Sequence, residues 1–153
     1  MQPTHSYRRN LPHIQRPGKT YFVTFCTKNH WILPEATRSV VLDTCRAVHE
    51  ITAFIHCAVI MPDHVHLILT PMADSRGETL LLEKVLRQIK GVSALKVNKA
   101  LNRHGPVWQA ESFDHMLRSM ESAESKSDYS VMNPVRRGLA LRPEEYPWYW
   151  RPQ

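Results

Sequence analysis

The chain has 153 residues, 42% of them hydrophobic and 22% charged, which is typical of a globular domain with a sizeable core. Lys and Arg outnumber Asp and Glu by 20 to 14, and the net charge of +6 indicates a polyanionic partner, most often nucleic acid, or else a soluble protein that happens to be basic. No apolar stretch approaches the roughly 18–20 residues needed to span a bilayer, so we expect no membrane partner.

The predicted elements begin after a polar, basic and proline-marked segment. Residues 1–19 are expected to form a basic N-terminal arm, and residues 20–153 a single domain. A β-branched and aromatic run predicts a strand over 21–26. A helix is then expected to open at Pro34 and to continue to about Glu50.

Five further elements complete the chain. They are strands over 54–60 and 64–70, a helix with apolar spacing from 82 to at least 95, a strand over 112–117, and a helix over 120–132. A tight turn at Pro62 and Asp63 is short enough to join the two central strands as an antiparallel hairpin. Pro134 is expected to stop the last helix.

The order strand, helix, strand, strand, helix, strand predicts an α+β fold with a ferredoxin-like or RRM-like split βαβ antiparallel sheet. An additional C-terminal helix follows, and it carries Tyr129. Such a sheet has one face covered by two helices and one face left available.

The segment M-P-D-H-V-H-L-I-L-T at 61–70 contains the turn and the third predicted strand. His64 and His66 lie on one face of that strand because successive side chains of a strand alternate. Two neighbouring imidazoles can grip a metal ion or a phosphate, or they can be ordinary sheet residues. A useful metal site needs at least one more ligand and an open position for the substrate.

Tyr129 and Asn133 are four residues apart and are expected on the same face of the last helix. Asn133 offers a hard oxygen ligand suited to Mg²⁺ or Mn²⁺, and a tyrosine phenolate is a competent nucleophile toward phosphorus. Alternatively, the tyrosine only packs its ring and the asparagine caps the helix before Pro134.

Together, these motifs resemble a known family. The pair His64-Val65-His66 looks like the HUH motif of single-strand DNA nucleases and transposases that use tyrosine. Further motifs are R-P-G-x-x-Y-F-V-T at 16–24, W-Q at 108–109, F-D-H-x-x-R at 113–118 and D-Y-x-x-x-N-P-V-x-x-G-L at 128–139. The combination, spread over about residues 7–149, is similar to the tyrosine transposases associated with REP palindromes.

The resemblance implies a transposase or nuclease that cleaves and rejoins single-stranded DNA at palindromic hairpins. Tyr129 would attack a phosphodiester and leave a 5′-phosphotyrosine and a free 3′-OH, while His64, His66 and Asn133 would hold Mg²⁺ or Mn²⁺. A non-catalytic, domesticated hairpin-binding protein is the alternative. A hydrolase of the histidine-triad type fits poorly, because Ile68 stands where a third alternating histidine would be needed.

Basic side chains supply the DNA-binding candidates. These are Arg8, Arg9 and Arg16 in the arm, Lys84 and Arg87 on the second helix, and Arg136 and Arg137 after Asn133. A disordered basic tail and a solvated helix face are the alternatives for the first two groups. The hairpin would bind to a monomer or to a homodimer, in which Tyr129 of one chain could lie beside the histidines of the other.

Several residues have both a functional and a structural interpretation. Asp63 and His115 could support the metal ligands or serve only in a turn and on the surface, and the aromatic residues at 148–150 could stack on bases or cap the core. Tyr146 and Tyr149 could compete as nucleophiles, although neither has an asparagine four residues later.

The cell compartment is expected to be the cytoplasm, in association with the nucleoid. The N-terminus has arginines but no apolar segment of the kind found in secretory signals. Cys26, Cys45 and Cys57 are odd in number and widely spaced within apolar patterns, which favours reduced, buried thiols over disulfides or a zinc site.

Overall fold

The structure, a computed structural model, describes residues 5–7 and 18–153. The arm candidates Arg8, Arg9 and Arg16 therefore lie outside the described residues. Strand β1 (His5–Tyr7) pairs antiparallel with β5 (Ser112–Met116), so part of the predicted arm adds an edge strand to the sheet.

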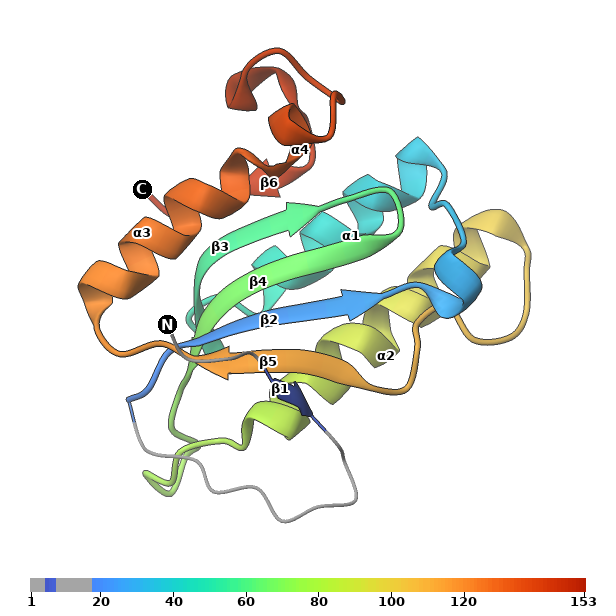
Figure 1. The fold of residues 1–153 in the computed structure, drawn as a ribbon. Helices are drawn as coiled ribbons and strands as arrows, with labels where there is room; N and C mark the ends of the chain where they lie inside the picture. The colour runs from blue at the N-terminus through green and yellow to red at the C-terminus, as the bar shows by residue number, and fades with distance from the viewer. Residues whose placement is uncertain (1–4, 8–17) are drawn as a thin grey trace.

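A six-stranded antiparallel sheet forms the centre of the molecule, in the order β1-β5-β2-β4-β3-β6 (Figure 1). The remaining strands are β2 (Tyr21–Cys26), β3 (Ala53–Ile60), β4 (His64–Pro71) and β6 (Tyr149–Trp150). With helices α1 (Glu35–Ala47) and α2 (Leu82–Leu101), the elements from β2 to β5 follow in the order strand, helix, strand, strand, helix, strand. The predicted α+β class is confirmed.

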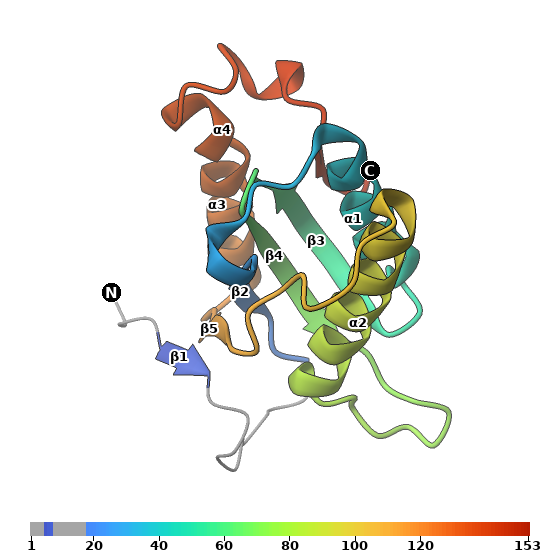
Figure 2. The same ribbon diagram turned by 90° about the vertical axis from the view of Figure 1, so that its right-hand side faces the viewer.

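Helices α1 and α2 cover one face of the sheet, as Figure 2 shows. The larger part of the core lies there, where strand residues such as Val23 and Leu67 meet Val41 of α1 and Leu86 of α2, all fully buried. The alternation of side chains along β4 places Val65, Leu67 and Leu69 in this core. It leaves the histidines of β4 on the opposite face.

Helix α3 (Met120–Val131) lies across part of that opposite face and packs on a smaller cluster around Phe22, Cys57 and Ile68. A short helix α4 (Asn133–Arg136) follows, and Tyr146 closes the cluster from the C-terminal segment. The two short 3₁₀ helices are η1 (Lys28–His30) and η2 (Pro143–Glu145).

The break between α3 and α4 corrects the prediction that Tyr129 and Asn133 share one continuous helix. Proline has no N–H to donate to the carbonyl four residues back, so Pro134 cannot continue α3 and instead occupies the first turn of α4. The preceding turn tightens, and the Met132 N–H donates to Tyr129 O at 3.3 Å.

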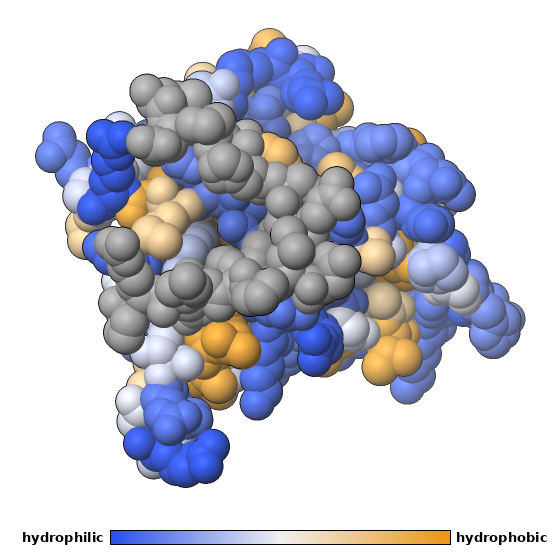
Figure 3. All heavy atoms as spheres, turned by 60° about the horizontal axis from the view of Figure 1, so that its bottom comes forward, coloured by the Kyte–Doolittle hydropathy of each residue, from blue (hydrophilic) through white to orange (hydrophobic). Residues whose placement is uncertain are grey.

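On the side shown in Figure 3, the surface formed by the described residues is mainly hydrophilic. Hydrophobic side chains form small separate patches on it. Within the described ranges, no helix combines the length and the apolar character that crossing a bilayer requires.

Candidate active site

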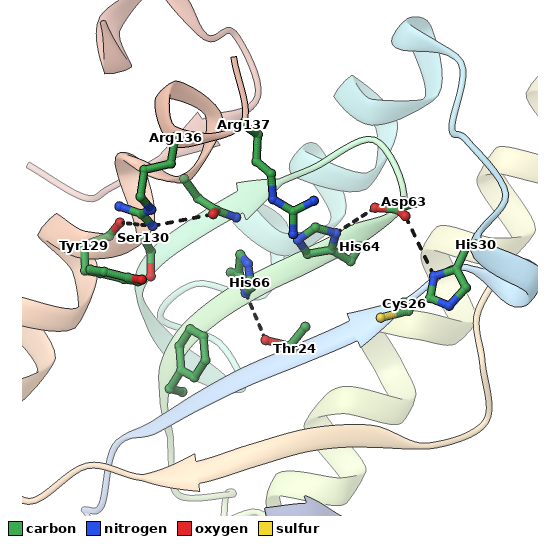
Figure 4. A pocket seen from close by; sticks show the side chains of 12 residues that line it. Thr24, Cys26, His30, Asp63, His64, His66, Tyr129, Ser130, Arg136 and Arg137 are labelled. Atoms are coloured by element: carbon green, nitrogen blue, oxygen red, sulfur yellow. Dashed lines mark hydrogen bonds and ion pairs between the residues drawn. The ribbon is translucent and has the colours of Figure 1, made fainter. Parts of the chain in front are cut away.

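A pocket of about 450 Å³ lies between the face of the sheet that carries the β4 histidines and the α3–α4 segment (Figure 4). It gathers His64 and His66 from β4 with Tyr129 from α3 and Asn133 from α4. All four predicted chemical groups therefore line one pocket, although they come from distant parts of the sequence.

The two histidines lie side by side, as strand alternation predicts. Their ring centroids are 4.8 Å apart and the ring planes meet at 80°. His66 lies opposite Thr24 of β2, and its ring stacks on Phe22 at 5.4 Å. The side chain of His64 is only 11% exposed, and His66 is half-buried.

Each histidine is oriented through its Nδ1 atom. The Asp63 carboxylate lies 2.7 Å from Nδ1 of His64, and Oγ1 of Thr24 lies 2.9 Å from Nδ1 of His66. In the tautomer in which Nδ1–H donates to these oxygens, Nε2 of each ring carries the lone pair that can bind a metal ion. The sequence offered Asp63 as a candidate, whereas Thr24 is found only through the cross-strand register.

Burial, together with the smaller effects of nearby His64 and of the cations Lys126, Arg137 and Arg136, lowers the pKa of His66 to about 3. The ring is therefore neutral at physiological pH. A neutral imidazole is the form that binds metal, so this ligand needs no proton release before binding.

Tyr129 stands at the edge of the pocket with 57% of its surface exposed. The Arg136 guanidinium lies 3.8 Å above its ring and donates from Nη2 to the Tyr129 carbonyl oxygen at 2.9 Å. Lys126 lies 5.0 Å from the same ring and 4.3 Å from the Phe22 ring, and burial, followed by the charge of Arg136, lowers its pKa. Lys126 precedes Tyr129 by three residues, a helical spacing that could have identified it.

Asn133 is half-buried, with Oδ1 3.5 Å from Nη2 of Arg136. Among the described residues, no group of three His, Cys, Asp or Glu side chains could hold a metal ion. Two imidazole nitrogens and one amide oxygen, all lining the pocket, are nevertheless kinds of donor that Mn²⁺ or Mg²⁺ accepts. The residues present fit such an ion.

The basic candidates fall on two sides of the sheet. Arg136 and Arg137 line the pocket. Lys84 and Arg87 lie on α2, which covers the other face, and Arg87 pairs with Glu83 at 3.1 Å. DNA binding by these four residues stays a prediction.

The other residues with two possible interpretations lie outside this pocket or in the core. Tyr146 is buried and donates its hydroxyl to Ile60 O, and burial raises its pKa to about 12, which makes it a poor nucleophile. Trp148 and Trp150 pack against the core, which confirms the core-capping interpretation for them. His115 lies on β5 opposite Phe22 and does not line the pocket.

The pocket thus brings the His–Val–His strand of an antiparallel sheet opposite a tyrosine on a helix. The chain is 24% identical to a Haemophilus influenzae protein named "Putative REP-associated tyrosine transposase", over 94% of this chain and 83% of the relative. Its fold is similar to that of a REP-associated tyrosine transposase bound to a REP hairpin, with a TM-score of 0.66 and 20% identity over 93% of this chain and 82% of that one. No family model matches the chain. The resemblance to REP-associated tyrosine transposases is thus confirmed.

Proposed function

We propose that this protein is a tyrosine transposase that cleaves and rejoins single-stranded DNA at palindromic hairpins through a 5′-phosphotyrosine. The observation that carries the proposal is the pocket itself, which brings Tyr129 together with His64 and His66. The structure of a similar protein bound to a REP hairpin supports hairpin DNA as the substrate.

Tyr129 is the nucleophile in this proposal. Its exposure leaves the ring accessible to a DNA strand, and the stacked Arg136 guanidinium restricts where the ring can lie. Arg136 and Arg137 present fixed positive charge to the phosphate that enters the pocket. The bond energy of the cleaved phosphodiester is kept in the phosphotyrosine, so a 3′-OH can reverse the step without ATP.

His64, His66 and Asn133 would hold the divalent cation, with Asp63 and Thr24 orienting the two imidazoles. When bound, Mg²⁺ or Mn²⁺ would polarise the scissile phosphate and offset the charge that develops on it.

The test is a denaturing gel of protein incubated with single-stranded hairpin DNA labelled on the 3′ side of the cut. Wild type should carry the label, whereas Tyr129→Phe should bind the hairpin and carry none. Tyr149→Phe removes the hydroxyl of a half-buried tyrosine in β6 and serves as the matched control, with the adduct retained. Tight binding by wild type without any adduct would favour the hairpin-binding alternative.

A further inference from the structure

The turn that follows β2 has an unusual backbone. Asn29 and His30 in η1 both have positive φ angles, of 57° and 54°. This left-handed region is disfavoured for residues other than glycine, and two consecutive examples require support from the surrounding structure. The strained turn presents the His30 side chain, which is 70% exposed and lines the same pocket as Tyr129.

Backbone hydrogen bonds hold this turn against the residues that precede His64. The Thr27 N–H donates to Asp63 O at 2.9 Å, and the Leu33 N–H donates to Pro62 O at 2.7 Å. The side chains of His30 and Asp63 also approach each other, with Nδ1 of His30 3.8 Å from Oδ2 of Asp63. One carboxylate thus faces His64 through Oδ1 and His30 through Oδ2.

His30 lies at the opposite end of the pocket from Tyr129. Figure 4 shows Tyr129 on one side, His30 on the other, and His64 and His66 between them. In phosphoryl transfer the attacking and leaving oxygens lie roughly in line on opposite sides of phosphorus. A phosphate held at the histidine pair and attacked from Tyr129 would therefore direct its leaving oxygen toward His30.

We propose that His30 is the general acid that protonates the 3′-oxygen leaving group, an inference that rests on the proposed cleavage by Tyr129. The Tyr129 oxygen forms a bond to phosphorus, and its proton passes to solvent. The bond from phosphorus to O3′ breaks with its electron pair on the oxygen, which takes the proton from Nε2 of His30. In rejoining, His30 takes that proton back from the 3′-OH.

The other groups at this end of the pocket are poorer acids. Burial raises the pKa of the Cys26 thiol, and the Asp63 carboxylate and neighbouring Lys90 oppose each other in their effect on it. Arg137 carries a guanidinium, which suits it to hydrogen-bond a phosphate oxygen rather than to act as an acid. Asp63 faces the two histidines and serves to orient them rather than to donate.

The test uses a leaving group that needs no proton. Hairpins are made with either oxygen or sulfur at the bridging 3′ position, because a thiolate is far more stable than an alkoxide and can leave unprotonated. Single-turnover rates of adduct formation are measured for the full chain as wild type and as His30→Asn, since asparagine tolerates a positive φ. Asn29→Gly, which relaxes the same turn, is the matched control.

On the oxygen hairpin, His30→Asn should slow adduct formation about a hundredfold or more. On the sulfur hairpin, the rate of adduct formation by His30→Asn should be close to that of wild type. Asn29→Gly should form the adduct at the wild-type rate on both hairpins. An equal loss on both hairpins would overturn the role of His30 as an acid and leave the proposed function standing. Absence of any adduct with wild type on both hairpins would overturn the proposed function and the inference with it.

Discussion

The depressed pKa of His66 links the candidate site to the stability of the protein. In the unfolded chain a histidine takes up a proton as the pH falls through about 6.5, whereas folded His66 does so only at about 3. Between these values the unfolded state binds more protons, so stability is lost as the pH falls. Above pH about 6.5 this group has no effect, because it is neutral in both states.

We therefore expect the free energy of unfolding to decrease between pH 6.5 and pH 5, by up to about 1.4 kcal/mol per pH unit from His66 alone. Urea unfolding in metal-free buffer measures this free energy at each pH. His66→Gln should have a shallower pH dependence than wild type, whereas His104→Gln, at an exposed position, should not. Parallel curves for wild type and His66→Gln would contradict the assignment.

Asp63 should matter to metal binding before any DNA is present. Its carboxylate orients His64 at 2.7 Å, and loss of such a partner typically weakens metal affinity about 10–100-fold. Titration calorimetry with Mn²⁺ should show a weakening of that size for Asp63→Asn. Asp43→Asn, on the exposed side of α1, is the control and should bind as wild type does. Equal affinities for all three proteins would show that Asp63 serves only the turn.

At the level of elements, strong local patterns predicted the fold well. The strand predicted over 21–26 matches β2, and the strands predicted at 54–60 and 64–70 differ from β3 and β4 by one residue at an end. These segments combine high β-propensity with a short hairpin turn, so neighbouring residues carry the information. The first helix ends at Ala47 instead of about Glu50, where Glu50 turns to a φ of 63°.

What the sequence did not predict depends on distant partners. β1 and β6 are three and two residues long and exist because β5 and β3 offer them edges. The contact of Thr24 with His66 follows from strand register, and the approach of His30 to Asp63 follows from a strained turn. Hydrophobic periodicity contains no information about such pairings.

Helix α3 carries Tyr129, so its N-terminal cap can be tested separately from the chemistry. The Ser119 side chain accepts a hydrogen bond from the Ser122 N–H at 3.1 Å. Removal of such a cap typically costs about 1 kcal/mol, so Ser119→Ala should lower the free energy of unfolding by about that amount. Ser125→Ala, at an exposed position within α3, should leave stability unchanged or raise it slightly. A loss of the same size in both variants would exclude the cap as the cause.

At the scale of the whole molecule, the sheet separates two basic surfaces. Arg136 and Arg137 lie in the pocket, while Lys84 and Arg87 lie on α2 beyond the opposite face. A hairpin that places a phosphate beside Tyr129 must meet the first pair, whereas it reaches the second only by passing around an edge of the sheet. We therefore expect Arg136 and Arg137 to contribute more to DNA binding than Lys84 and Arg87.

The salt dependence of hairpin affinity can measure how much each of these two surfaces contributes to binding. Each phosphate neutralised on a single strand contributes about −0.7 to the slope of log affinity against log salt. Binding of the hairpin to Tyr129→Phe, which cannot form the adduct, should weaken steeply with salt. Adding Arg137→Gln should make the slope shallower by about 0.7, and adding Arg87→Gln should change it less, because Arg87 is also paired with Glu83. A larger change for Arg87→Gln than for Arg137→Gln would show that the hairpin is held mainly on α2, and that only its cleaved end enters the pocket.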